Sequence, residues 1–478
     1  MHCATAVRPF GYLLLVSAVI GCNDPFHFDA SSQAPEVCPA SREWLPHTPP
    51  LDLFQPLPHP HSECPFYRGG WQNFLIATQP DASGAPAFLS YPTIDTVFQS
   101  SKPKPAQRSV LGDVRQAGGR EVLIDQNGNP IVFGIHVNQA YADFIAFQKL
   151  QTKEAIDCAN PRLFFPAGVV EFKSAWQIVE GDMATDDYIS VMTTIPTLSL
   201  DATHHLVENR ATPRMVRVRL LALHVVFTLP GHPEFVWATF EHSAADGTRD
   251  VAPIDPRDVD PDLMNDDDTV ISSTDYLLYK AGTPANRANQ SIAETDLMLD
   301  SATQKFTGQQ TSIYRLFPAS KSNTTKPDDA VSSLNFNVEA LFAQAAAQLD
   351  PADQRGHYRL VGAVWMDQPR FFAIDASLEN DQSSPYAHEA NFGQDLRENG
   401  TDSDFSILAG EDRLSSTAME SFTQATDSFP NCFSCHNTQA VTARGVSLNR
   451  DSGGTKLLDP KLINVSHVLS QFLLEESQ

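Results

Sequence analysis

Five β-prone runs follow one another between residues 163 and 242, and they limit the possible folds more than any other feature of the sequence. Each run is bounded by clusters of Pro, Gly or Asp. Short runs with this spacing are typical of antiparallel strands that pair in a sandwich or barrel. The runs are Leu163 to Phe165, Val169 to Ile178, Tyr188 to Thr194, Val216 to Thr228 and Phe235 to His242.

Helical patterns are shorter and lie outside these runs. The 34 Pro residues exceed the 24 Gly residues, which favours strands and ordered loops over a helix bundle. An Asn127-Gly128 turn predicts a hairpin over Val122 to Phe133. Helices are expected at Gln139 to Leu150, Asn335 to Leu349, Ser416 to Phe422 and Ile463 to Leu474, and two further strands at Tyr358 to Met366 and Phe371 to Ile374. The prediction is an α+β fold, with a large β-rich, sandwich- or barrel-like body at 63–405 and a small helical segment at 406–478.

The N-terminus has the pattern of an export signal. Arg8 precedes an apolar run from Phe10 to Ile20, which is too short to span a bilayer. Gly21-Cys22 closes that run and looks like the lipobox of bacterial lipoproteins, so we expect a signal peptide at 1–21 and a lipid on Cys22. The alternative is an ordinary secretory signal cut nearby. We expect a protein of the periplasm or cell envelope, lipid-anchored to a bacterial membrane, with a Pro-rich tether at 22–62.

The charge balance restricts the partners. The chain has 58 acidic and 33 basic side chains, a formal net charge of −25. Binding to nucleic acid depends on Lys and Arg that neutralise phosphates, so this balance argues against a nucleic-acid partner. A protein partner is expected to dock through a basic face.

The Cys432-Phe433-Ser434-Cys435-His436 run is the motif with the most specific chemistry. Covalent attachment of a c-type haem needs two thiols for the porphyrin vinyl groups and an imidazole for the iron, and this run contains all three. A thioredoxin-like redox site would be expected near the N-terminus of its domain. A zinc site would need a second ligand pair at similar spacing, which the other cysteines do not form. The sequence therefore predicts one haem c, with His436 as an iron ligand.

The second axial ligand of that iron has several candidates. His467 lies on the predicted last helix, and Met419 precedes the motif. His242 is a more distant candidate, and an open iron position is the remaining alternative. Met/His ligation raises the reduction potential relative to His/His, while an open position would permit ligand binding or peroxidase chemistry.

The other cysteines predict one disulfide. Cys3 would be lost with the signal peptide, which leaves Cys38, Cys64 and Cys158 in an oxidising compartment. We favour a Cys64 to Cys158 bond, because Cys38 lies in the predicted tether. Two charged residues on a predicted strand, Glu171 and Lys173, are explained by strand alternation, and the alternative is a buried polar pair.

With these motifs in view, the chain resembles a group of exported bacterial c-type cytochrome-like proteins with a single haem motif. In that group a long β-rich region precedes Asn-Cys-Phe-x-Cys-His. The resembling segments here are Cys64 to Phe74, Phe165 to Trp176, Glu234 to His242, Gly410 to Phe422, Asn431 to Asn437 and Asn464 to His467. The resemblance implies a c-type haem protein and carries no defined activity.

These observations lead to one functional expectation and two alternatives. The expectation is electron transfer through a covalently bound haem to a redox partner protein. The first alternative is a haem enzyme, oxidase- or peroxidase-like, with an open or labile sixth iron position, because a body of this size exceeds what a carrier requires. The second is a surface binding module in which the haem is structural.

Overall fold

In the computed structural model, residues Glu36–Gln478 form one compact unit. The structure describes residues 37–45, 62–99, 111–115, 121–230, 232–243, 251, 268–270, 272–315, 330–351, 353–366, 408–410, 414, 416–422, 432–434, 436, 441–442, 456–458 and 461–477. No helix in these ranges is both long enough and apolar enough to cross a membrane.

Seven strands form one antiparallel sheet, which confirms the predicted α+β fold with a β-rich body. Neighbouring strands follow the order β1, β2, β4, β5, β8, β9, and β3 pairs with β4 outside that order. These seven strands make a single open sheet, where the sequence predicts a sandwich or barrel. They are β1 (Val132–Val137), β2 (Val170–Ile178), β3 (Ser190–Leu200), β4 (Leu206–Leu229), β5 (His232–His242), β8 (Tyr358–Met366) and β9 (Leu408–Gly410).

Several shorter elements surround this sheet. Two small ribbons pair β6 (Leu299–Asp300) with β7 (Lys305–Phe306), and β10 (Val441–Thr442) with β11 (Lys456–Leu458). The helices are α1 (Cys64–Ala77), α2 (Ile94–Val97), α3 (Gln139–Gln148), α4 (Lys153–Asp157), α6 (Ala330–Ala345) and α10 (His467–Ser477). Single 3-10 turns cover Arg42–Trp44, Ala87–Ser90, Ala285–Arg287, Glu294–Asp296, Arg355–His357, Cys432–Ser434 and Leu462–Val465.

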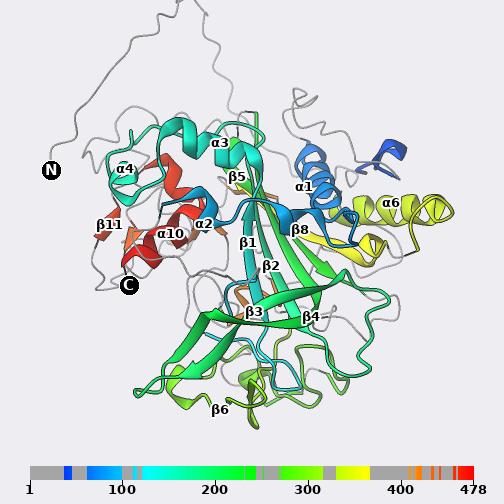
Figure 1. The fold of residues 1–478 in the computed structure, drawn as a ribbon. Coiled ribbons are helices and arrows are strands. Elements are labelled where there is room, and N and C mark those ends of the chain that lie inside the picture. The colour runs from blue at the N-terminus through cyan, green and yellow to red at the C-terminus, as the bar shows by residue number, and fades with distance from the viewer. Residues whose placement is uncertain are drawn as a thin grey trace, which may run out of the picture. The chain divides into compact units, whose positions relative to one another are not determined.

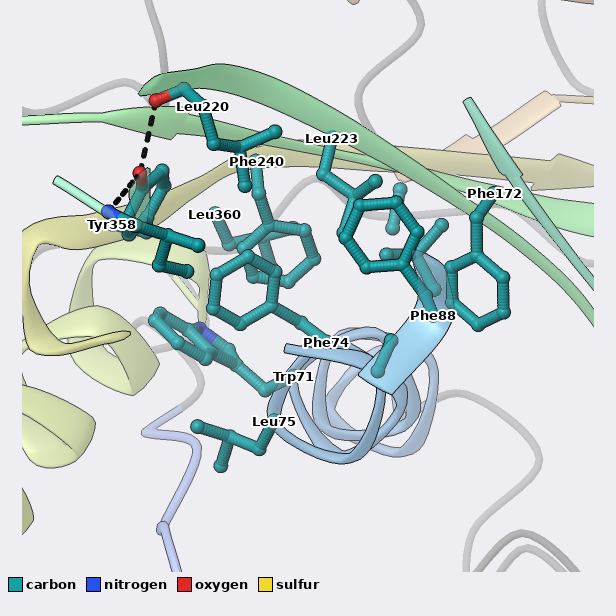
Figure 2. Close-up of a cluster of buried hydrophobic side chains, with 14 of the residues drawn as sticks. Trp71, Phe74, Leu75, Phe88, Phe172, Leu220, Leu223, Phe240, Tyr358 and Leu360 are labelled. Atoms are coloured by element: carbon teal, nitrogen blue, oxygen red, sulfur yellow. Dashed lines mark hydrogen bonds between the residues drawn. The ribbon is translucent and has the colours of Figure 1, made fainter. Parts of the chain in front are cut away.

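The first face of the sheet packs against α1 and α6 (Figure 1). Figure 2 shows aromatic side chains of α1 pointing toward the strands, where Phe74 stacks on Phe240 with ring centroids 4.4 Å apart. Helix α1 can approach β5 closely at Gly70 because glycine has no side chain. A Cβ added there would lie 3.1 Å from the Cβ of Ala238. The Tyr358 hydroxyl donates to the Leu220 carbonyl at 2.9 Å, so the polar atom buried in this core is satisfied.

The second face packs against α3 and α10. Successive side chains of a strand alternate between faces, so the residues between those of the first core point here. We name the apolar group on this side the second-face cluster; it includes Val226, Phe235, Trp237, Val361 and Val364 of the sheet, Tyr141, Phe144 and Ile145 of α3, and Val468, Leu469, Phe472 and Leu473 of α10. The start of α3 is fixed by Asn138, whose side chain accepts from the Tyr141 N–H at 3.0 Å.

The predicted turn is confirmed, one predicted helix is wrong, and one predicted strand is not described. The Asn-Gly turn is present, with Gly128 at φ +79° and a bridge between Ile124 and Pro130. The helix predicted at Ser416 to Phe422 is wrong for most of that segment, which bends because Glu420 adopts φ +52°. Strand β8 pairs with β9 on its outer side, and the predicted partner Phe371 to Ile374 lies outside the described residues.

The predicted disulfide between Cys64 and Cys158 is wrong. Cys64 bonds to Cys38, with Cα atoms 5.3 Å apart, and not to Cys158. Cys38 is held close to α1 because its backbone N–H donates to the Ser333 hydroxyl of α6, at 2.9 Å, and its carbonyl accepts from Asn337 at 2.8 Å. Part of the predicted tether therefore packs on the body.

Candidate functional site

The Cys432–His436 motif folds into one tight turn. Residues Cys432–Ser434 form a 3-10 turn, and the His436 N–H donates to the Cys432 carbonyl at 2.9 Å. Phe433 is fully buried in the second-face cluster, and Cys432 packs at its edge. Cys435, which precedes His436, and the predicted lipidation site Cys22 lie outside the described residues.

The structure brings His436 and His467 together. Their ring centroids are 5.0 Å apart and their planes are inclined by 73°. On its other side His436 stacks on Trp237 of β5, with centroids 4.4 Å apart. The Nε2 atom of His467 is buried and has no hydrogen-bond partner within the described part of the chain. We call this arrangement the His436–His467 pair; it joins the motif to the first residue of α10.

Both imidazoles are held neutral. Each ring is partly exposed, yet burial lowers the pKa of His436 to about 3, with nearby Glu420 opposing this shift and Lys173 and His224 adding to it. Burial, followed by the neighbouring His436, holds the pKa of His467 well below its ordinary value. A neutral imidazole has a lone pair for a metal, so both rings are in the protonation state that a metal ligand requires.

A buried carboxyl group of the central sheet holds the start of α10. Glu171 of β2 accepts a hydrogen bond from the Ser466 hydroxyl, and the Tyr141 hydroxyl lies 2.9 Å from that same oxygen. The Leu469 N–H also donates to it, at 3.3 Å. Burial raises the pKa of Glu171 to about 8, although Ser466 and the backbone N–H groups of His467 and Val468 favour its charged form. Glu171, which the sequence left without a role, is thus directly beside a candidate ligand.

A polar row lies beside this carboxylate on the second face. Lys173 and His224 are cross-strand neighbours, as are His224 and Thr239. Glu420 pairs with Lys173 through one carboxylate oxygen, and its other oxygen lies 2.8 Å from His224 Nε2. Thr239 Oγ1 lies 2.9 Å from the second nitrogen of His224. Burial opposes ionisation of Glu420, but Lys173 and His224 outweigh it and hold the pKa of that carboxyl well below its ordinary value.

The other candidate ligands lie elsewhere. Met419 is fully buried in a third apolar cluster, with Leu123, Phe133 and Ala222 among its members, whereas Phe433 of the motif belongs to the second-face cluster. His242 stacks on Tyr188 at 3.6 Å, and its Nε2 lies 3.0 Å from the Asp187 carbonyl. Among the described residues, the ring contacts of His242 are with Tyr188, His357 and Tyr358, and not with His436.

The sequence missed several residues of this site. Four of these residues lie on strands along the second face: Trp237, Glu171, Lys173 and His224. A fifth, Glu420, lies in the bent segment before the motif. The detectable signal was the placement of two charged residues, Glu171 and Lys173, at alternate positions of a strand that is otherwise rich in apolar side chains. Buried ionisable groups are rare unless paired, so such positions mark a site or an ion pair.

Comparisons with protein-family models, curated proteins and solved structures return no match for this chain. Within the described residues, no group of three or more His, Cys, Asp or Glu side chains is arranged to hold a metal ion.

Proposed function

We propose that this chain is an exported c-type cytochrome-like protein that transfers electrons through one covalently bound haem. The observation that carries the proposal is the contact between the His436 and His467 rings, 5.0 Å apart, on two segments that meet over the second face of the sheet. A motif with two thiols and an imidazole, placed against a second neutral imidazole, is the ligand set of a haem with two axial histidines.

The surroundings of the pair fit such a group. His467 has a buried ring nitrogen with no hydrogen-bond partner among the described residues, and burying an unsatisfied polar atom is costly. Coordination to iron would satisfy that atom. The neighbouring side chains Phe433, Ile463 and Val465 are apolar and buried, as the walls of a haem pocket need to be.

Each residue then has a defined task. Cys432 and Cys435 would form the thioether bonds, and His436 and His467 would hold the iron. When bound, the haem iron would supply reversible one-electron oxidation and reduction. Trp237 holds the His436 ring by stacking, and Phe433 of the motif is buried in the second-face cluster. Met419 is the weaker candidate, because its side chain lies in the third cluster.

The location and partner follow from the sequence. Cys22 would carry the lipid that anchors the protein in the periplasm or cell envelope. The excess of acidic side chains, with a formal net charge of −25, would attract a redox partner protein with a basic docking face.

Covalent attachment is tested first. The protein is expressed in the periplasm with the c-haem maturation machinery, and a pyridine haemochrome spectrum is recorded after denaturing extraction. We expect haem to stay with the wild-type chain and with a Ser434→Ala control, and to be lost or weakened in Cys432→Ala and Cys435→Ala. A well-folded, exported wild-type chain without covalent haem would refute the proposal.

The second axial ligand is tested by optical and EPR spectra of the holoprotein. We expect a six-coordinate low-spin spectrum in both oxidation states, conversion to high-spin in His467→Ala, and no change in Met419→Leu or in a His205→Ala control at a half-exposed position. Loss of the low-spin spectrum in Met419→Leu alone would assign methionine instead. A high-spin wild-type spectrum with peroxide turnover would favour a haem enzyme over an electron carrier.

A further inference from the structure

Ser466 and Glu171 connect the central sheet to the first turn of α10. Helix α10 begins at His467, so its candidate ligand is also its first helical residue. The first N–H groups of a helix have no partner within the helix and need one outside it. Here the Ser466 hydroxyl accepts from the Leu469 N–H at 3.3 Å, as an N-cap residue does.

Ser466, the N-cap residue, is itself held by Glu171 of β2. Glu171 is 2% exposed, and its carboxyl group accepts from the Ser466 hydroxyl. One carboxyl group on a central strand therefore acts on the hydroxyl that caps α10.

A third group completes this link. Tyr141 of α3 is fully buried, and its hydroxyl lies 2.9 Å from the Ser466 oxygen. Strand β2 is further joined to the start of α3, because the Asn138 side chain accepts from both the Tyr141 N–H, at 3.0 Å, and the Val170 N–H, at 3.1 Å. The start of α10 is thus held by both β2 and α3, which are themselves joined.

We infer that Glu171 is the positioning residue of the proposed haem site: through Ser466, the N-cap residue of α10, it holds the first turn of that helix and so orients the imidazole of His467 toward His436. This inference rests on the proposed function. Glu171 does not touch the ring, so its effect is on the fraction of molecules in which His467 is bound. Groups around a ligating histidine commonly control its orientation in this way.

The test measures spin state and added imidazole in the covalent holoprotein. Removing the carboxylate in Glu171→Leu is expected to produce a high-spin fraction and to strengthen the binding of free imidazole by about tenfold, because a helix cap has a comparable effect on a local equilibrium. Glu171→Gln keeps an acceptor for Ser466 and is expected to restore the low-spin spectrum. Ser466→Ala, a smaller change, is expected to shift the spectrum in the same direction as Glu171→Leu.

The control is Thr152→Ala, which removes the N-cap of α4, where the Thr152 hydroxyl accepts from the Ala155 N–H at 3.3 Å. The Thr152 hydroxyl caps α4 and not α10, so the variant weakens a different helix end, and its spectrum should stay low-spin. If Glu171→Leu and Ser466→Ala lose stability but keep the wild-type spin state and imidazole affinity, the inference is wrong while the proposed function stands. If the wild-type chain carries no covalent haem, or its low-spin spectrum survives in His467→Ala, the proposed ligation fails first.

Discussion

The indole of Trp237 lies nearly parallel to the imidazole of His436, with ring centroids 4.4 Å apart and planes inclined by 19°. Trp237 belongs to β5 in the middle of the sheet, and His436 belongs to a short turn near the C-terminus. The stack therefore places the segment with the most specific chemistry against an inner strand of the sheet, paired on both sides.

We expect Trp237→Ala to destabilise the protein by about 4 kcal/mol, because it removes a large buried side chain. The same substitution at Trp365, which stacks on Phe66 in the first core at 4.0 Å, should cost a similar amount. Only Trp237→Ala should change the haem spectrum and lower haem loading. Urea unfolding and pyridine haemochrome assays measure the two effects, and equal spectra in both variants would contradict a role for the stack.

The ion pair between Lys173 and Glu420 leads to a second prediction. Glu420→Gln leaves Lys173, whose side chain is 8% exposed, without its carboxylate, and should lower the free energy of unfolding by about 2 kcal/mol. A Lys173→Met and Glu420→Gln double variant should recover part of this loss, because no unpaired charge then remains. Chemical unfolding of Glu420→Gln, Lys173→Met and the double variant gives the coupling energy, and strictly additive losses would disprove the coupling.

The Cys38–Cys64 disulfide predicts a common effect of two substitutions. Cys38→Ala and Cys64→Ala should each lower stability by about 3 kcal/mol, because the bond closes a loop in the unfolded chain, and the double variant should be no worse than either. Mass spectrometry of a non-reduced digest should find Cys38 and Cys64 in one linked peptide pair. A peptide that links Cys64 to Cys158 would contradict the structure.

His136 predicts a pH dependence of stability. It is fully buried in β1, both ring nitrogens lack partners among the described residues, and burial lowers its pKa to about 4. Between pH 6.5 and pH 4 the unfolded chain takes up a proton that the folded chain does not, so stability falls as the pH falls through this window.

The size of this effect is about 3 kcal/mol between pH 7 and pH 4. The measurement compares urea unfolding of the wild type and His136→Phe at both pH values. The variant should lose less stability than the wild type by this amount. An identical loss in both proteins would show that His136 does not remain neutral in the folded state.

The sequence predicted the sheet well because strand signals are local. The runs at Val169 to Ile178 and Phe235 to His242 correspond to β2 and β5, and alternation of apolar residues assigns their two faces. It did not predict that Glu171 and Lys173 both face a buried site, because their partners Ser466 and Glu420 are distant in the chain. Sequence alone also could not choose between Cys38 and Cys158 as the disulfide partner of Cys64. Two hydrogen bonds between Cys38 and α6 hold Cys38 in place, and neither can be read from the sequence.

Helix ends show the same limit. The predicted helix at Ile463 to Leu474 is divided in the structure into a 3-10 turn and α10, with Ser466 between them. Glu420 ended another predicted helix by adopting a left-handed backbone, which places its carboxylate against Lys173 and His224. In both cases a tertiary contact overrode the local preference.

The Cys38–Cys64 bond also sets how far the body could reach from a membrane. If Cys22 is the lipidated residue, about 16 residues separate it from the first covalently fixed position at Cys38, and a fully extended chain of that length spans at most about 55 Å. Without the bond, and with the segment before Cys64 released, the span would be more than twice as long. On that condition the disulfide would more than halve the distance that the body could move away from its lipid anchor.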